Sequence, residues 1–570
     1  MAQQAGGGQH PQQQQQFSMW GAAGVAARGG GGEQHAPPPS CPPGVSPPML
    51  NEMIFSVFPE RDGGARVLHD VCLEGDTIVL HGSNTAAGSW DFLNGGGLPM
   101  FDVGRFEEFY RHARPPGSSV DGGLLPVHGT QCRHAPLRFR YPSQQEAAQQ
   151  PYFSDCTVPL LVFSNWIFNF AEFLTRVPAR LVRFQRVWQV FDGNITVVLA
   201  TCGALPLAPY HRQLVAPFTR HEVTNWASFA APGASSQSKA TAESVNVRCF
   251  KRLAIVGFTD ADYGQSYTAA QAALSYHQRQ LPPSTLFKSG ATTLKLLFEA
   301  RMPAGHLPSS STGATQDQAA GEPPPSQEEN STAPLAADLP EMVSLRAWMQ
   351  RERLQSAEFP REPASFASRP VYRGTRQLLG LEQLLADCRS HDWSGALADT
   401  LWTGVECAAY SFGEEGKLLQ DMAAAQQANV FLSLHGAGEM NSLFMRHGSI
   451  KVQLRPKDFG TVHRWMSNGY WPKVCQQAGH PVQCWFVNIE EEGSWEPGVV
   501  ERLGLYWQSD NERCRDRHFR LTVRHVDAVL RRALPLHGKR EAFVARWEAG
   551  PMAITFNDGG NITWAPHMEV

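Results

Sequence analysis

One segment constrains the fold of this chain more than any other: residues 428–456, ANVFLSLHGAGEMNSLFMRHGSIKVQLRP. Its apolar run Val430–Leu434 has the length and composition of a buried parallel strand. After a glycine-containing turn, the pattern predicts a short helix over Glu439–Arg446 and a second strand over Ser449–Leu454. The turn should therefore lie at the carboxyl end of a strand, which is where open α/β sheets bind ligands.

The turn itself reads His435-Gly436-Ala437-Gly438. Glycines allow the backbone to approach a ligand closely. A helix that begins at such a turn directs free N–H groups and its positive dipole end outward, which suits a phosphate. The spacing lacks the third glycine of the dinucleotide-binding fingerprint. Taken alone, it more often marks a plain tight turn than a phosphate site.

The whole string, LxxHGAGxxNxxFMxxGSxxxxLxP, resembles the signature of the sugar-nucleotide domain of glycosyltransferase family 61. The resemblance is carried by His435, Gly436, Ala437, Gly438, Asn441, Phe444, Gly448 and Pro456. The chain departs from the family pattern at Glu439 and Met440, where the family has Leu and Thr, and at Gln453, where an acidic residue is common. An acidic side chain there can hold ribose hydroxyls, and an amide does so less strongly.

Further elements resemble the same family in the same order along the chain. Residues 158–180 predict a strand, a turn at Ser164-Asn165 and a helix that carries Glu172, with Phe168 where the family has histidine. The segment 249–257 resembles the strand that closes the amino-terminal domain. Residues 294–301 resemble the strand, ending in Arg301, that opens the donor domain, and 376–385 resemble an RxxxNxxxLL element that begins at Arg376 and has Gly380 in place of asparagine.

The resemblance implies roles for these residues, and each role has a simpler alternative. Glu172 is either the catalytic base or a solvated or paired helix glutamate. Arg301 and Arg376 either receive the departing diphosphate, because guanidinium groups match phosphate oxygens, or form surface ion pairs. His435 either donates to a phosphate or ribose or makes a structural hydrogen bond. The resemblance also assigns Gly436, Ala437, Gly438, Asn441 and Gln453 to nucleotide-sugar binding.

Alternating helix and strand patterns, together with the resemblance, predict an α/β protein of the GT-B type, with two Rossmann-like domains facing a cleft. Glycine, glutamine and proline dominate residues 1–48, which should be disordered. We assign 49–285 to an acceptor-side domain and 286–545 to a nucleotide-sugar-binding domain with a low-complexity insertion at 303–340. Residues 546–570 form a C-terminal tail.

Composition excludes several other classes of protein. A formal net charge of −4 and a pI near 6.6 argue against a dedicated nucleic-acid binder. The 11 cysteines show no CxxC spacing, so a zinc cluster is disfavoured, and disulfides and buried thiols remain equal alternatives. Asp260-Ala-Asp262 is either a metal-binding DxD motif or, as the chain context favours, an ordinary turn. Neither GxSxG nor HExxH occurs.

The sequence shows no signal peptide, and no window reaches the roughly 18 apolar residues of a membrane helix. A membrane anchor is thus not visible, although the family resemblance implies an enzyme of the Golgi or endoplasmic reticulum lumen. The implied reaction is inverting transfer of a sugar of the xylose, arabinose or N-acetylglucosamine class. The donor is a UDP-sugar, the acceptor is a hydroxyl of a glycan or glycoprotein, and no metal cofactor is expected. The alternative is a catalytically inactive GT-B-fold protein that binds glycans or acts as a scaffold.

Overall fold

The computed structural model describes residues 41, 47–52, 65–74, 77–82, 138–149, 151–164, 167, 169–200, 207–230, 248–258, 261–300, 376–413, 416–461, 474–475, 482–497, 514–515, 517–550 and 552–565. These residues belong to one compact unit, Cys41–Val570. Arg301, the insertion at 303–340 and most of the segment 1–48 lie outside the described residues, as do Asn165 and Phe168.

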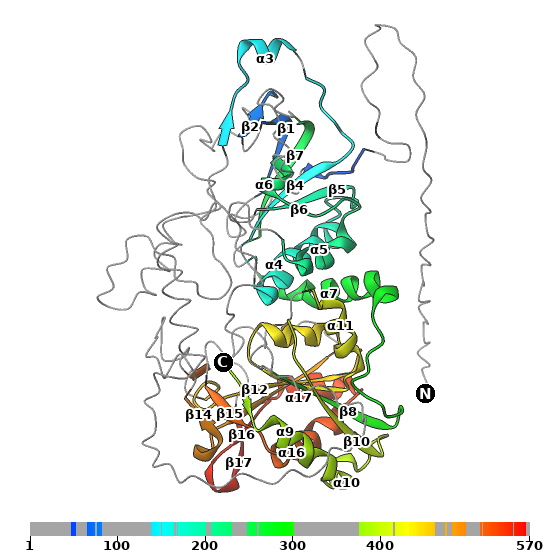
Figure 1. Ribbon diagram of the computed structural model, residues 1–570, viewed down its shortest axis with the longest axis vertical. Coiled ribbons are helices and arrows are strands. Elements are labelled where there is room, and N and C mark those ends of the chain that lie inside the picture. The colour runs from blue at the N-terminus through cyan, green and yellow to red at the C-terminus, as the bar shows by residue number, and fades with distance from the viewer. Residues whose placement is uncertain are drawn as a thin grey trace, which may run out of the picture. The chain divides into compact units, whose positions relative to one another are not determined.

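Within the described residues, the first large sheet has seven strands in the order β3-β2-β1-β7-β4-β5-β6 (Figure 1). The strands are β1 (Ala65–Glu74), β2 (Thr77–Leu80), β3 (Arg138–Arg140), β4 (Val158–Ser164), β5 (Ile195–Leu199), β6 (Thr224–Asn225) and β7 (Arg248–Phe258). Strands β7, β4, β5 and β6 are parallel to one another, whereas β1 runs antiparallel to both β7 and β2. The sheet is therefore mixed, with a parallel half that contains the predicted strand after residue 158.

The central strands of this sheet are buried on both faces, as their continuous apolar sequences VPLLVFS and ITVVL predict. Leu160 and Val162 of β4 pack with helix α4 (Phe170–Val182), while Leu161 and Phe163 contribute to a second cluster on the opposite face. Helix α4 begins at Asn169, whose side-chain oxygen accepts hydrogen bonds from the next turn. The other helical segments are α3 (Gln144–Gln149), η3 (Arg183–Val187), α5 (Pro209–Val215), η4 (Ala216–Phe218), α6 (Trp226–Ala230), α7 (Tyr263–His277) and η5 (Gln278–Gln280).

The second large sheet has seven strands among the described residues, in the order β10-β8-β11-β12-β13-β16-β17 (Figure 1). They are β8 (Thr293–Glu299), β10 (Gly404–Tyr410), β11 (Val430–Leu434), β12 (Ile450–Arg455), β13 (Gln483–Ile489), β16 (Ala553–Phe556) and β17 (Ile562–Ala565). All neighbours are parallel except β16 and β17. The last two strands come from the segment assigned to a tail and complete this sheet.

Helices accompany the second sheet in the βαβ pattern that a parallel sheet requires. They are α9 (Leu381–Ser390), α10 (Ser394–Leu397), α11 (Leu418–Gln427), η8 (Ala437–Phe444), η9 (Glu492–Ser494), α16 (Val523–Ala533), η10 (Leu534–Leu536), α17 (Arg540–Glu548) and η11 (Asp558–Gly560). A small three-stranded sheet is formed by β14 (Trp495–Glu496), β15 (His518–Arg520) and β9 (Leu378–Leu379). The two large, mainly parallel sheets make this an α/β protein, consistent with two Rossmann-like domains.

Four disulfides occur among the described residues: Cys41–Cys156, Cys72–Cys249, Cys388–Cys407 and Cys475–Cys484. Of the two alternatives for the cysteines, cross-linking applies to these eight, while Cys514 is buried and does not belong to these four disulfides. Disulfides persist in oxidising compartments, so the four bonds indicate a location in the secretory pathway. In the part of the chain that the structure describes, none of the helices combines the length and apolar character needed to cross a bilayer.

Candidate functional site

The predicted strand–turn–helix–strand unit is present, and its turn follows β11 directly. Residues 435–438 are half-buried, and Gly436 has φ +146° and ψ −169°, a conformation that favours glycine. The following helix is the 3-10 helix Ala437–Phe444 and not an α-helix over 439–446. Its carboxylate Glu439 folds back, and Oε1 accepts a hydrogen bond of 3.2 Å from the Gly436 N–H. This N–H donor, which was predicted to point at a ligand, thus has an acidic partner within the protein.

The second glycine of the turn packs against a carboxylate of the neighbouring strand. A Cβ atom at Gly438 would overlap with Oε1 of Glu299, the last residue of β8. Glu299 is buried, and its Oε2 accepts a hydrogen bond of 2.9 Å from the Leu434 N–H at the end of β11. A larger residue at position 438 would therefore require the buried Glu299 side chain to move.

Three polar side chains of β12 face this turn from within the protein. Lys451, Gln453 and Arg455 alternate along the strand, so they project to the same face, and each is 0% exposed. Lys451 Nζ lies 2.8 Å from Glu439 Oε2, and Gln453 Nε2 lies 3.0 Å from each oxygen of Glu439. Arg455 Nε donates to Gln453 Oε1 at 2.8 Å. Glu439 is thereby held by a lysine, an amide and a backbone N–H, which compensates for its burial.

His435 joins the turn to this network. Gln453 Nε2 donates to His435 Nδ1 at 2.8 Å, and the imidazole packs on Phe459 with ring centroids 4.9 Å apart. Burial lowers the pKa of His435 well below its ordinary value, and nearby cations, which include Arg376 and Arg515, lower it further. The ring is thus neutral at physiological pH. Because Nδ1 accepts, the proton is on Nε2, where it can be donated.

Cationic side chains converge on the turn from separate parts of the sequence. Arg376, which precedes β9, is buried and donates from Nη1 to the His435 carbonyl. Arg515 is buried as well. Burial lowers the pKa of Lys451 to about 8 and that of Arg455 to about 9, while it raises the pKa of Glu439. Each of the two basic groups nevertheless retains its proton at neutral pH, so buried cations surround the turn and are offset in part by Glu439, the ion-pair partner of Lys451.

A second polar group lies at the carboxyl end of the next strand, β13. Glu490 accepts hydrogen bonds from the Asp458 N–H and from Thr461 Oγ1, the latter at 2.8 Å. Burial raises the pKa of Glu490, and the nearby Asp458 carboxylate adds to this effect. Asp458 in turn forms a 2.6 Å ion pair with Arg517. The carboxyl edge of the sheet therefore carries polar side chains across three adjacent strands.

The structure brings seven of the nine sequence-predicted site residues together, whereas Glu172 lies on a helix of the first sheet. Arg376, His435, Gly436, Ala437, Gly438, Asn441 and Gln453 lie at or beside the turn. Asn441 Nδ2 donates 2.8 Å to the Gly438 carbonyl, so it braces the turn, and Gln453 is engaged inside the network. Arg301 lies outside the described residues.

Glu172 is in the first turn of α4, where its carboxylate pairs with Arg176 at 2.8 Å one helical turn later. This is the paired-glutamate alternative. Helix α4 packs against η8, the helix that follows the turn, but no contact of Glu172 itself with the turn is seen among the described residues. Asp262, the second carboxylate of the possible metal-binding motif, also has a basic partner. It precedes α7 and pairs with Arg183 through both carboxylate oxygens, with one N–O distance of 2.7 Å.

Sequence reasoning missed Glu439, Lys451, Arg455 and Arg515 as members of the site. The signal for two of them was present, because β12 reads I-K-V-Q-L-R, an alternation of polar and apolar residues in a strand flanked by apolar strands. Such a polar face must meet partners inside the protein. Comparison of the chain with protein-family models and with curated proteins finds no match.

Proposed function

We propose that this protein is a GT-B-type glycosyltransferase that moves a sugar from a UDP-sugar to a hydroxyl of a glycan or glycoprotein with inversion. The observation that carries the proposal is the glycine turn after β11, which lies among buried cations at the carboxyl edge of a parallel sheet. A departing nucleoside diphosphate gains negative charge as the glycosidic bond breaks. A fixed positive field at that place stabilises this charge in the transition state.

Each residue at the turn has a role in this proposal that agrees with its contacts. Arg376 and the neutral His435 Nε2–H bind the diphosphate or ribose. Gln453 is a positioning residue, because its amide holds the imidazole in the tautomer that donates from Nε2. Glu172 takes the proton of the acceptor hydroxyl as general base, for which its ion pair with Arg176 has to open.

The proposal assigns the acceptor to residues 49–285, which contain the first large sheet, and the nucleotide sugar to 286–545, which contain the first five strands of the second. It also places the protein in the Golgi or the endoplasmic reticulum lumen, since glycan-building transferases work on substrates that pass through these compartments. Sugar transfer would use the xylose, arabinose or N-acetylglucosamine class of donor. The donor is a substrate, and the chain's own cations neutralise the diphosphate.

A second candidate function is supported by a specific observation: the turn's acidic contacts. Glu439 accepts from the Gly436 N–H, and Glu299 lies directly behind Gly438. Glu172, the proposed base, is paired with Arg176. A protein that retains the fold but has lost the chemistry would tolerate these contacts. In that case the chain binds glycans or acts as a scaffold without a nucleotide substrate.

Titration calorimetry with UDP, followed by a UDP-sugar hydrolysis assay, distinguishes the two functions. The transferase proposal expects UDP to bind, and it expects Arg376→Gln to weaken this binding by about tenfold through loss of a charge-assisted contact. Arg389→Gln, on helix α9, is the matched control and should bind as the wild type does. Absence of UDP binding to the folded wild-type protein would favour the non-catalytic function.

A further inference from the structure

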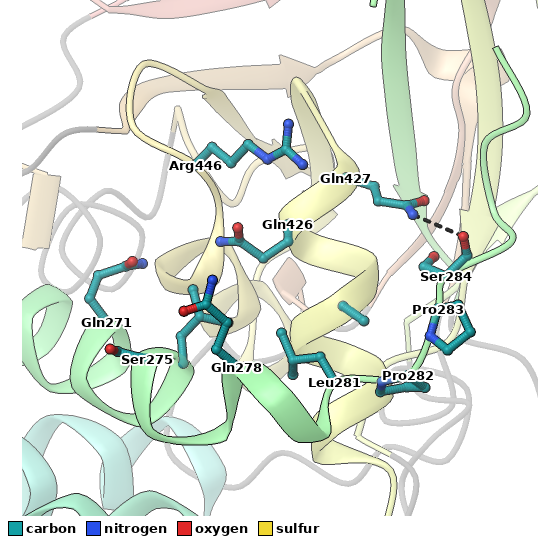
Figure 2. A pocket seen from close by; sticks show the side chains of 12 residues that line it. Gln271, Ser275, Gln278, Leu281, Pro282, Pro283, Ser284, Gln426, Gln427 and Arg446 are labelled. Carbon is teal, nitrogen blue, oxygen red and sulfur yellow. Dashed lines mark hydrogen bonds between the residues drawn. The ribbon is translucent and has the colours of Figure 1, made fainter. Parts of the chain in front are cut away.

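A pocket of about 530 Å³ lies between the helical segments α7–η5 and α11 (Figure 2). It is lined by Gln271, Leu274, Ser275, Gln278, Leu281, Pro282, Pro283, Ser284, Ala423, Gln426, Gln427 and Arg446. Residues 435–438 are not part of this lining, so the pocket is separate from the candidate nucleotide site. Its volume falls within the range of about 300–1,000 Å³ that is common for small-molecule sites.

Two glutamine amides of the pocket have a fixed orientation. Gln271 Nε2 donates 2.7 Å to the Leu443 carbonyl, and Gln426 Nε2 donates to the Phe444 carbonyl. These carbonyls belong to the last turn of η8, where backbone acceptors need external donors. A carbonyl can only accept a hydrogen bond, so each NH₂ group must face η8. The side-chain oxygens of both glutamines are therefore turned away from η8 as acceptors.

Gln427 repeats this arrangement on the opposite wall. Its Nε2 donates 2.9 Å to the Ser284 carbonyl, as the dashed line in Figure 2 shows. Its Oε1 is buried and has no hydrogen-bond partner among the described residues. This oxygen is inaccessible to a ligand, so Gln427 contributes a fixed wall to the pocket and not an acceptor. The amide oxygens of Gln271 and Gln426 thus make the pocket a place for ligands with several donor groups.

Arg446 places a positive charge at one side of the pocket, where an anionic group of a ligand would be favoured (Figure 2). Its side chain is exposed, and no carboxylate of the described residues is paired with it. The described lining contains no acidic residue. A guanidinium group presents parallel N–H donors that match the two oxygens of a carboxylate. Apolar contact is available from Leu274, Leu281 and Pro282 for the C–H faces of a ring.

We propose that this pocket binds a saccharide that carries a carboxylate. Sugar hydroxyls donate to the amide oxygens of Gln271 and Gln426, and the carboxylate lies against Arg446. A free phosphate is disfavoured because it brings few donors to a wall of acceptors, and a hydrocarbon ligand would leave the amides unpaired. The pocket does not use the nucleotide site, so the proposal stands whether or not the chain transfers sugars.

Titration calorimetry of the full chain with trigalacturonic acid and with maltotriose, a neutral trisaccharide, tests this proposal. The acidic trisaccharide should bind about tenfold more tightly than the neutral one, and Arg446→Ala should remove this difference. Gln271→Leu, which removes one of the two amide acceptors, should weaken both ligands. Arg279→Ala is the matched control, because Arg279 is exposed on η5 next to the pocket but does not line it.

The thermal unfolding midpoint of each variant verifies that the protein remains folded. Arg279 and Arg446 are both exposed, so their substitution by alanine should leave the fold intact. Equal binding of the acidic and neutral trisaccharides would overturn the proposal. It would equally be overturned by an Arg446→Ala variant that binds trigalacturonic acid as the wild type does, or by a wild-type protein that binds neither trisaccharide. A loss of UDP binding has no bearing on these outcomes, so failure of this proposal and failure of the transferase proposal are distinguishable.

Discussion

The two large sheets are of similar size but are held together at their centres by different means. In the first sheet, strands β4 and β5 are mainly apolar and carry no charged residue, and a disulfide joins Cys72 and Cys249, which face each other on β1 and β7. In the second sheet, the central strand β12 carries Lys451, Gln453 and Arg455 in its interior. The first sheet thus relies on a covalent link and apolar burial, whereas the second places a charged network where an apolar core would be simpler. Buried charge at a strand end is typical of a binding or catalytic site.

Removing the first sheet's disulfide should have the largest effect. Cys72 and Cys249 are 177 residues apart, and the chain-entropy model predicts a cost of about 5 kcal/mol for the double serine variant. The disulfide that joins Cys388 of α9 to Cys407 of β10 in the second sheet spans 19 residues, and the same model predicts about 3 kcal/mol for its removal. Denaturant unfolding of the two variants measures the difference. Equal losses would show that the covalent link is no more important to the first sheet than to the second.

The charged network of the second sheet should be nearly as sensitive. Lys451→Met leaves the Glu439 carboxylate buried without its partner, which should lower the free energy of unfolding by roughly 3–5 kcal/mol. The double variant Glu439→Gln/Lys451→Met should lose less than the single variant, because no unpaired charge remains. In helix α4, which packs on the first sheet, Arg176→Ala should cost less, about 1 kcal/mol, since both members of this pair keep partial access to water. Urea titrations measure the free energy of unfolding of all three variants. If Lys451→Met lowers it as little as Arg176→Ala does, the second sheet does not depend on its buried ion pair more than the first sheet depends on the pair in α4.

A smaller effect than that of Lys451→Met is expected at the turn itself. Gly438→Ala places a methyl group against Glu299 and should lower the free energy of unfolding by roughly 1–3 kcal/mol. Gly404→Ala is the matched control at the start of β10, where a Cβ meets no atom within 4 Å, and it should be nearly neutral. Thermal unfolding followed by circular dichroism measures both. Equal stability of the two variants would mean that the contact between Gly438 and Glu299 is not tightly fixed.

Strand positions were the part of the fold most accessible to sequence reasoning. The apolar run 430–434 is β11, and the strand predicted over 449–454 is β12, Ile450–Arg455, within one residue. Both succeed because a parallel strand buried on two faces requires a continuous or alternating apolar pattern. The helix after the turn was shifted and is of the 3-10 type, because it begins directly at Ala437 after the positive-φ glycine.

Residues of the candidate site were harder to predict, since their meaning depends on tertiary contacts. Glu439 departs from the family pattern, and only the position of Lys451 across the strand shows that it is an ion-pair partner. Arg515 reaches the same cluster from a segment without any motif. Gly438 was expected to admit a ligand, but Glu299 from β8 takes this space, and no local sequence signal links two residues so far apart. Contacts between residues that are far apart in the chain are the part of the structure that a single sequence predicts least well.

The disulfide between β1 and β7 has a consequence for biosynthesis. A ribosome adds about 5–20 residues per second, so roughly 10–35 s pass between the synthesis of Cys72 and that of Cys249, 177 residues later. During this interval the hairpin of β1 and β2 can form, but one edge of β1 stays open until β7 has been translated. The nascent chain therefore presents an unpaired strand edge and a reactive thiol together. Folding of the first sheet should accordingly depend on chaperones and disulfide isomerases that shield the growing polypeptide.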